Sequence, residues 1–185
     1  MKNIILIGFM GAGKTTIGKL LAKETELAFV DTDERIEQEQ GQKIPDIFAQ
    51  EGELYFRDLE TELLQRMQED TYGSVVSVGG GMPVREQNRA LLRSLGCVVY
   101  LSAGKQTILE RVKKDGSRPM LEGGSLEERV ERLMREREGY YRQAAHIDVR
   151  TDGRSIRQVL QIISQETRKY GVVLQQFHDG KSKQV

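Results

Sequence analysis

Short apolar runs alternate with longer amphipathic segments along this chain. The apolar runs lack a clean polar–apolar alternation, which is typical of strands buried on both faces of a parallel sheet. They cover residues 4–7, 27–30, 75–78, 98–101 and 147–149. Between them, helical patterns begin near Lys14, Glu34, Ile44, Glu53, Val84, Lys105, Leu126 and Ser155. The pattern predicts an α/β domain of three layers (α/β/α), with helices on both faces of about five parallel strands.

Two segments interrupt this alternation. Residues 33–69 contain several helical patterns and no apolar strand, so we expect an insertion packed over one edge of the sheet. Residues 113–125 read KKDGSRPMLEGGS, a polar and glycine-rich composition that is typical of a mobile loop. From about Gln175 the chain is polar and aperiodic, and we expect a loose tail there.

Charge and cysteine content narrow the classes of protein. The 185 residues hold 28 Lys plus Arg and 28 Asp plus Glu, so the formal net charge is zero. This balance argues against a general nucleic-acid or membrane binder, which needs a basic surface. The single cysteine, Cys97, lies in an apolar run and excludes an internal disulfide. No apolar run approaches the roughly 20 residues of a membrane span, so we expect a cytoplasmic protein, and we expect a monomer.

Residues 8–15, GFMGAGKT, match the phosphate-loop pattern G-x-x-x-x-G-K-[ST]. An apolar strand leads into the motif and a helix leads out, so backbone N–H groups and the positive helix end would converge on a phosphate. Lys14 is expected to reach the β- and γ-phosphates, and the Thr15 hydroxyl to ligate Mg²⁺. The alternative is a chance glycine-rich turn, which the correct flanking elements disfavour. The predicted nucleotide-binding residues of this loop are Gly11, Ala12, Gly13, Lys14, Thr15 and Thr16.

Elements of other P-loop classes are missing from the sequence. A GTPase needs an N-K-x-D segment to read its base, and the chain contains none. The D-x-x-G match at residues 70–73 precedes a predicted strand and so lies at the wrong end of it. No Asp follows the strand at 75–78 as a Walker B residue; Gly79, Gly80 and Gly81 follow instead. Three glycines there indicate close approach of a ligand to the backbone, with a simple turn as the alternative.

Two carboxylates follow the second predicted strand, at the edge where ligands gather in open α/β sheets. In an extended conformation Asp31 and Asp33 would face the same way. We expect Asp31 to hold Mg²⁺, through water, and Asp33 to accept a hydrogen bond from an attacking hydroxyl. The alternative is a turn in which Asp33 caps the following helix.

Two arginines are candidates for binding anions. On the helix that begins at Leu126, Arg137 falls on the apolar stripe, and an inward arginine needs an anion or a carboxylate partner. An internal salt bridge is therefore the competing interpretation. Arg118, in the glycine-rich loop, could close over the γ-phosphate and neutralise charge in the transition state. An arginine in such a loop, taken alone, is more often a solvated residue.

The chain resembles the shikimate kinase family over nearly all of its length, to about residue 165. The matching segments are GFMGAGKTTIGKLLA, the D-T-D at 31–33, DIFAQEGELYFRDLE, SVGGGMP, the SRPML loop and LMREREGYYR. The resemblance implies the nucleoside-monophosphate-kinase type of P-loop fold in residues 1–168, with an extension at 169–185. It also implies a substrate-binding insertion at about 33–61 and a lid at about 113–124. The implied activity is transfer of phosphate from ATP to the 3-hydroxyl of shikimate.

The same resemblance implies roles for individual residues. Substrate-binding positions are Asp33, Arg57, Gly79, Gly80, Gly81 and Arg137, with the two arginines on the substrate carboxylate and Asp33 activating the hydroxyl. Lys14 and Arg118 correspond to catalytic ATP-phosphate positions, and Thr15 and Asp31 to the Mg²⁺ site. Arg111 and Arg154 correspond to positions that flank the adenine. The loop after Thr151 lacks a proline that is often present in the family, which weakens the match at Arg154.

Two other functions stay open at this point. One is a kinase of the same architecture that acts on gluconate or a nucleoside monophosphate. The other is a non-catalytic nucleotide-dependent switch, against which the missing GTPase elements and the presence of Asp33 both argue.

Overall fold

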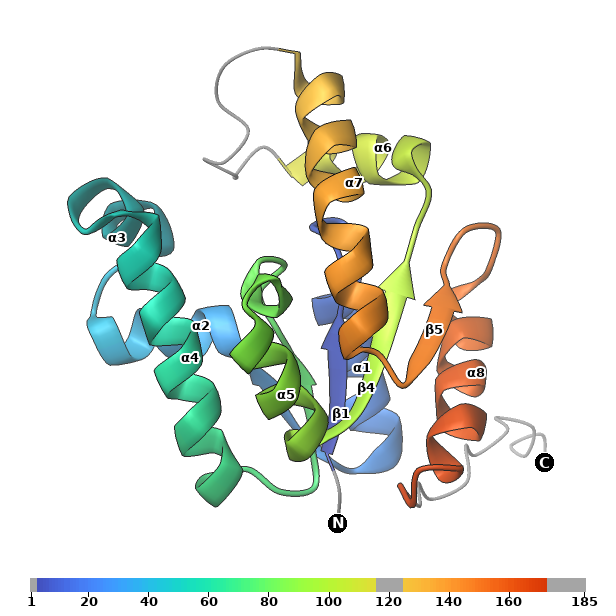
Figure 1. Cartoon of the computed structure of the whole chain (residues 1–185). Coiled ribbons are helices and arrows are strands. Elements are labelled where there is room, and N and C mark those ends of the chain that lie inside the picture. The colour runs from blue at the N-terminus through green and yellow to red at the C-terminus, as the bar shows by residue number, and fades with distance from the viewer. Residues whose placement is uncertain (1–2, 116–124, 173–185) are drawn as a thin grey trace, which may run out of the picture.

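A single parallel sheet forms the centre of the protein. The computed structural model describes residues 3–115 and 125–172, and its five strands lie in the order β2-β3-β1-β4-β5 (Figure 1). The strands are β1 (Asn3–Ile7), β2 (Ala28–Asp31), β3 (Ser74–Ser77), β4 (Gly96–Ser102) and β5 (Ile147–Arg150). Every residue of β1 and β3 is buried, which explains why their apolar residues are consecutive and do not alternate with exposed polar ones. The predicted α/β class and parallel sheet are confirmed.

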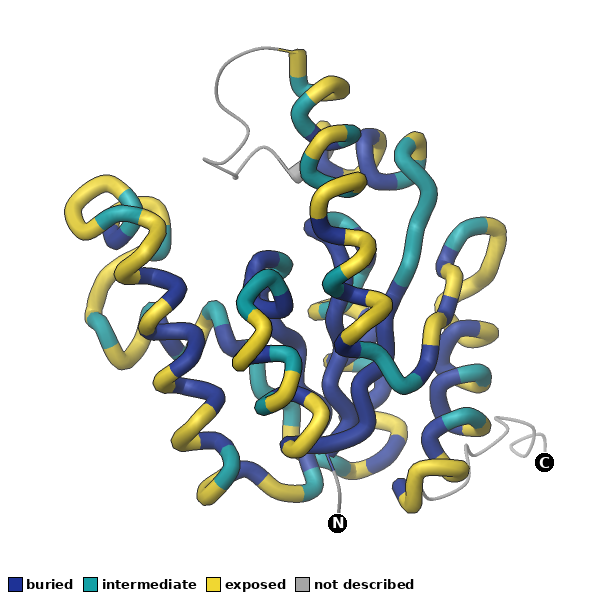
Figure 2. The backbone as a smooth tube through the Cα atoms, in the orientation of Figure 1, coloured by how far each residue is buried: buried dark blue, intermediate teal, exposed yellow. Residues whose placement is uncertain are grey.

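Helices cover both faces of the sheet. They are α1 (Lys14–Thr25), α2 (Thr32–Gln40), α3 (Ile44–Gln50), α4 (Gly52–Asp70), α5 (Glu86–Leu95), α6 (Lys105–Asp115), α7 (Leu126–Ala144) and α8 (Ile156–Arg168), with a 3₁₀ turn η1 (Met82–Val84). α1 packs beside α8, and α5 packs beside α7 in front of the strands. Figure 2 shows the buried tube concentrated in the sheet, with exposed residues on the outer faces of the helices.

The strand register brings the ends of β1, β2 and β3 together. Asp31 at the end of β2 pairs with Ser77 of β3, and Ser77 pairs with Leu6 of β1. The segments that follow these strands therefore start side by side at the carboxyl edge of the sheet, where the phosphate loop, α2 and the three glycines begin.

The expected insertion consists of helices. Between edge strand β2 and β3 the chain forms α2, α3 and α4, which stand to one side of the sheet in Figure 1. Of the expected lid, residues 113–115 end α6, and residues 116–124 lie outside the described part of the chain. No helix in the described residues is both long enough and apolar enough to cross a membrane.

Two residues shortly after α8 contact the rest of the domain. The Tyr170 hydroxyl donates to the carbonyl oxygen of His146 at 3.0 Å, and Val172 is fully buried. The extension expected from residue 169 thus begins with residues that belong to the packed domain. Residues 173–185, which include most of the expected tail, lie outside the described residues.

Candidate active site

The phosphate loop joins β1 to α1. Gly8, Gly11 and Gly13 have φ angles of 146°, 76° and 96°, a region that favours glycine. α1 has no side-chain cap, so its first N–H groups are directed towards the loop and can meet an anion. The Lys14 ammonium donates to the carbonyl oxygens of Gly8 (2.9 Å) and Phe9 (3.2 Å), which keeps it over the loop.

Thr15 and Asp31 lie together beside this loop. The Thr15 hydroxyl donates to Oδ2 of Asp31 at 3.1 Å, although the two residues are 16 apart in sequence. The other oxygen, Oδ1, accepts from the backbone N–H of Asp33 at 3.1 Å and so caps α2. One hydroxyl and one carboxylate are oxygen donors that suit Mg²⁺, which usually completes its shell with phosphate and water. The pair fits the predicted metal position.

The extended conformation assumed for Asp31 and Asp33 is wrong. α2 begins at Thr32, so Asp31 ends the strand and caps the helix while Asp33 stands in the first helical turn. Local capping therefore sends the two carboxylates to different places. Asp31 faces Thr15, whereas Asp33 lines a neighbouring cavity.

This cavity, of about 300 Å³, lies next to the phosphate loop. Segments far apart in sequence form it: α2, α3, α4, the turn after β3, and α7. Its lining includes all six residues predicted to bind the substrate, together with Glu60 and an apolar side formed by Ile44, Pro45, Phe48 and Phe56. The structure thus brings Asp33, Arg57, the three glycines and Arg137 around one space beside the loop.

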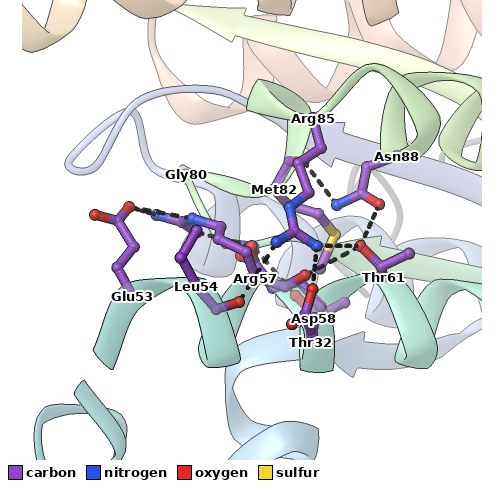
Figure 3. A network of polar contacts seen from close by, with 12 residues as sticks. Thr32, Glu53, Leu54, Arg57, Asp58, Thr61, Gly80, Met82, Arg85 and Asn88 are labelled. Atoms are coloured by element: carbon purple, nitrogen blue, oxygen red, sulfur yellow. Dashed lines mark hydrogen bonds and ion pairs between the residues drawn. The ribbon is translucent and has the colours of Figure 1, made fainter. Parts of the chain in front are cut away.

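Both arginines are buried, but their surroundings differ. Arg57 is 7% exposed and donates to Glu60 (Nη1–Oε2, 2.7 Å) and to Glu53 (Nη2–Oε1, 2.8 Å). Figure 3 shows the contact with Glu53 at the start of α4. Arg137 is 6% exposed, and among the described residues no carboxylate lies within ion-pair distance of it. The internal salt bridge considered for Arg137 is therefore absent from the described part of the chain.

Glu60 is a charged site residue that the sequence interpretation missed. It is completely buried, and burial raises its pKa to about 7 even though Arg57 offsets part of this effect. The available signal was its place on the apolar stripe of α4, four residues after Phe56 and three before Leu63. Arg137 was found from the same signal on α7.

Two of the three glycines lie directly against side chains of the site. A Cβ at Gly81 would lie 2.3 Å from Nη1 and Nη2 of Arg57, and one at Gly79 would lie 2.5 Å from Oδ1 of Asp33. Neither residue has a positive φ, so the reason is space rather than backbone conformation. Close approach to the backbone of this turn is therefore made by two side chains that line the cavity, those of Arg57 and Asp33.

The residues predicted to contact the adenine lie in different surroundings. Arg111 of α6 donates from Nη1 to the carbonyl oxygen of Gly11 at 3.0 Å, which places it over the phosphate loop. Arg154 donates to the carbonyl oxygen of Arg150 and lines a second cavity, of about 600 Å³, between β4, β5 and α7. Arg118 lies outside the described residues.

The protein is a P-loop kinase of the nucleoside-monophosphate-kinase type. This class is defined by the phosphate loop after the central strand, the strand order β2-β3-β1-β4-β5 and the adjoining cavity for an acceptor. The family model for shikimate kinase matches residues 10–168. A shikimate kinase from Thioalkalivibrio sulfidiphilus is 48% identical over 90% of this chain and 87% of that protein. The chain belongs to the shikimate kinase family.

Solved structures agree with this assignment. The shikimate kinase from Acinetobacter baumannii, in complex with shikimate, has a TM-score of 0.86 and 36% identity, covering 93% of this chain and 96% of that one. A gluconokinase from Sinorhizobium meliloti has a TM-score of 0.55 and 14% identity over 92% and 95% of the two chains. At that identity, the second similarity shows the shared fold alone.

Proposed function

We propose that this protein transfers the γ-phosphoryl group of ATP to the 3-hydroxyl of shikimate, giving shikimate 3-phosphate and ADP. The observation that carries the proposal is the convergence of Asp33, Arg57 and Arg137 on one cavity beside the phosphate loop. Such a space suits a small acceptor that has a carboxylate at one end and a hydroxyl at the other. The membership of the shikimate kinase family and the shikimate complex of the A. baumannii relative support this choice of acceptor.

On the acceptor side, each charged group has a distinct task. Arg57 and Arg137 bind the substrate carboxylate through charge-assisted hydrogen bonds. Asp33 accepts a hydrogen bond from the 3-hydroxyl and takes its proton as the oxygen attacks the γ-phosphorus. Gly79 and Gly81 have no side chain where Asp33 and Arg57 lie, which leaves room for these two groups beside the substrate.

On the nucleotide side, the loop residues Gly11 to Thr16 bind the phosphates and Lys14 contacts the transferred group. Thr15 and Asp31 would hold Mg²⁺, which supplies positive charge to the β- and γ-phosphate oxygens when bound. The bond from the γ-phosphorus to the ADP oxygen breaks as the bond to the shikimate oxygen forms. Catalysis of this step is mainly positioning and charge neutralisation.

Several assignments rest on the resemblance more than on contacts. Arg118 would neutralise charge on the transferred phosphate, and Arg111 and Arg154 would flank the adenine. We also propose that residues 33–61 act as the substrate-binding part and 113–124 as a lid over a single domain. A monomer in the cytoplasm, with neither nucleic acid nor membrane as a partner, remains our prediction.

The variant Asp33→Asn tests the proposed reaction, because it keeps the shape of the side chain and removes its capacity to take a proton. We expect kcat to fall at least 100-fold, with the Kd for ATP unchanged within about twofold. Asp46→Asn, at an exposed site on α3, is the matched control and should keep normal turnover. A near-normal kcat for Asp33→Asn would remove Asp33 from the chemistry.

A further inference from the structure

Tyr141 lies one helical turn after Arg137 on α7. The two side chains therefore share a face of the helix. Tyr141 is 1% exposed, and its ring stacks on that of Tyr100 in β4, with centroids 5.2 Å apart and planes at 29°. The sheet thus fixes the position of the ring.

The Tyr141 hydroxyl connects α7 to the turn after β3. It donates to the carbonyl oxygen of Gly80 at 2.6 Å. Arg137 is its charged neighbour on the same face of α7, and the charge of Arg137 acts on the phenol. The hydroxyl that binds the middle glycine of the turn is therefore also a polar neighbour of the substrate-binding arginine.

Its surroundings keep this hydroxyl protonated. Burial raises the pKa of Tyr141 well above its usual value, and the charge of Arg137 offsets part of that increase. The phenol consequently remains a donor to Gly80 across the whole range of pH in which the protein is folded.

The two arginines of the cavity thus have different polar neighbours. Arg57 is held by the side-chain carboxyl groups of Glu53 and Glu60, at 2.8 and 2.7 Å. Arg137 has a neutral phenol beside it and, among the described residues, no carboxylate within ion-pair distance, so its charge remains available for an incoming anion. A carboxylate in place of Tyr141 would compete with the substrate for the same guanidinium.

We propose that Tyr141 is a positioning residue that orients Arg137 towards the acceptor carboxylate and fixes the position of Gly80 relative to Arg137. This inference rests on the proposed function, since it takes the acceptor to be a carboxylate. Tyr141 does not touch the reacting atoms. Its loss should therefore weaken acceptor binding and leave the chemical step largely intact.

The test is Tyr141→Phe, which removes the hydroxyl and keeps the stacked ring. We expect the KM for shikimate to rise about tenfold, while kcat and the KM for ATP change by less than twofold. Tyr100→Phe, on the other ring of the stack, is the matched control and should leave all three constants unchanged. A KM for shikimate that stays within twofold in Tyr141→Phe would overturn the proposal.

A shikimate analogue with a carboxamide in place of the carboxylate separates positioning from a merely structural role. With this analogue the effect of Tyr141→Phe on KM should shrink to less than twofold, because Arg137 no longer has an anion to bind. An equal loss for both acceptors would contradict the proposal.

The Arg137→Ala background tests the link between the two residues directly. There, adding Tyr141→Phe should change the KM for shikimate by less than twofold, and a further tenfold rise would refute the link between the two residues. A wild-type protein without shikimate-dependent turnover would instead refute the proposed function. The two failures are therefore distinguishable.

Discussion

Glu60 lies among the charged side chains of the acceptor cavity with none of its surface exposed. It accepts a 2.7 Å hydrogen bond from Arg57, yet burial outweighs that contact and raises its pKa to about 7, with the charge of Asp33 adding to the increase. The folded protein therefore holds a proton on Glu60 at pH values where the unfolded chain, with an ordinary pKa of 4.5, has lost it.

This shift predicts how stability depends on pH. Below pH 4.5 the carboxyl is protonated in both states, so Glu60 does not make the free energy of unfolding depend on pH. Between about pH 4.5 and 7 the folded state binds more protons than the unfolded state, so the free energy of unfolding falls as pH rises. The loss should approach the order of 3 kcal/mol by pH 8. Urea unfolding of the wild type and Glu60→Gln at pH 5 and pH 8 measures it.

The control is Glu62→Gln, at an exposed position of the same helix, measured at the same two pH values. If the wild type instead gained stability relative to Glu60→Gln as pH rises, Glu60 would be ionised throughout and the pairing with Arg57 would dominate.

For single residues, the sequence predicted which side chains are buried, but it did not predict the hydrogen bond that starts α2. The apolar stripe of α7 predicted that Arg137 faces inward. Glu60 lies on the equivalent stripe of α4, and the same reasoning would have predicted its burial. The conformation of Asp33 could not be predicted from spacing alone, because capping by Asp31 starts α2 at Thr32, two residues before the predicted start at Glu34.

At the scale of elements, a buried amide joins α4 to α5 and the turn before it. Asn88 is fully buried; its Nδ2 donates to the carbonyl oxygen of Met82 at 3.1 Å, and its Oδ1 accepts from the Thr61 hydroxyl at 2.8 Å (Figure 3). Thr61 lies one turn after Arg57 on α4. The contact thus fixes the helix that bears Arg57 relative to the turn that follows the glycines.

We predict that Asn88→Ala lowers the free energy of unfolding by about 2–3 kcal/mol, because it leaves a buried carbonyl and a buried hydroxyl without this partner. Equilibrium unfolding in urea measures the change. Glu62→Ala, on the solvent side of α4, should stay within about 0.5 kcal/mol. A loss below 0.5 kcal/mol for Asn88→Ala would mean that α4 and α5 are held by apolar packing alone.

Most elements could be predicted because apolar periodicity is a local property. The five strands and the eight helices of the described residues begin within two residues of the predicted positions, and α5 begins two residues after Val84. Pro83 and its neighbours form a 3₁₀ turn first, and α5 starts at Glu86. The order of the strands depends on non-local pairing, which periodicity does not encode.

At the scale of the whole molecule, the cavity draws residues from Asp33 to Arg137 to one place. Their proximity comes from the strand order and from the helices α2, α4 and α7 that surround the carboxyl edge of the sheet. Residue types and motifs in the sequence predicted these cavity-lining side chains one at a time, without their proximity. Only the fold shows that Arg137 has no carboxylate within ion-pair distance among the described residues, whereas Arg57 has two.

The most direct test of this account compares acceptors. The purified protein is incubated with ATP and Mg²⁺ and with shikimate, gluconate or adenosine monophosphate in turn; ADP release is followed, and the phosphorylated product is identified by mass and by the position of the phosphate. We predict ADP release that depends on shikimate, with phosphate on the 3-hydroxyl, and turnover at least 100-fold lower with the other two acceptors. A higher kcat/KM for gluconate or adenosine monophosphate, or ADP release independent of any acceptor, would contradict it.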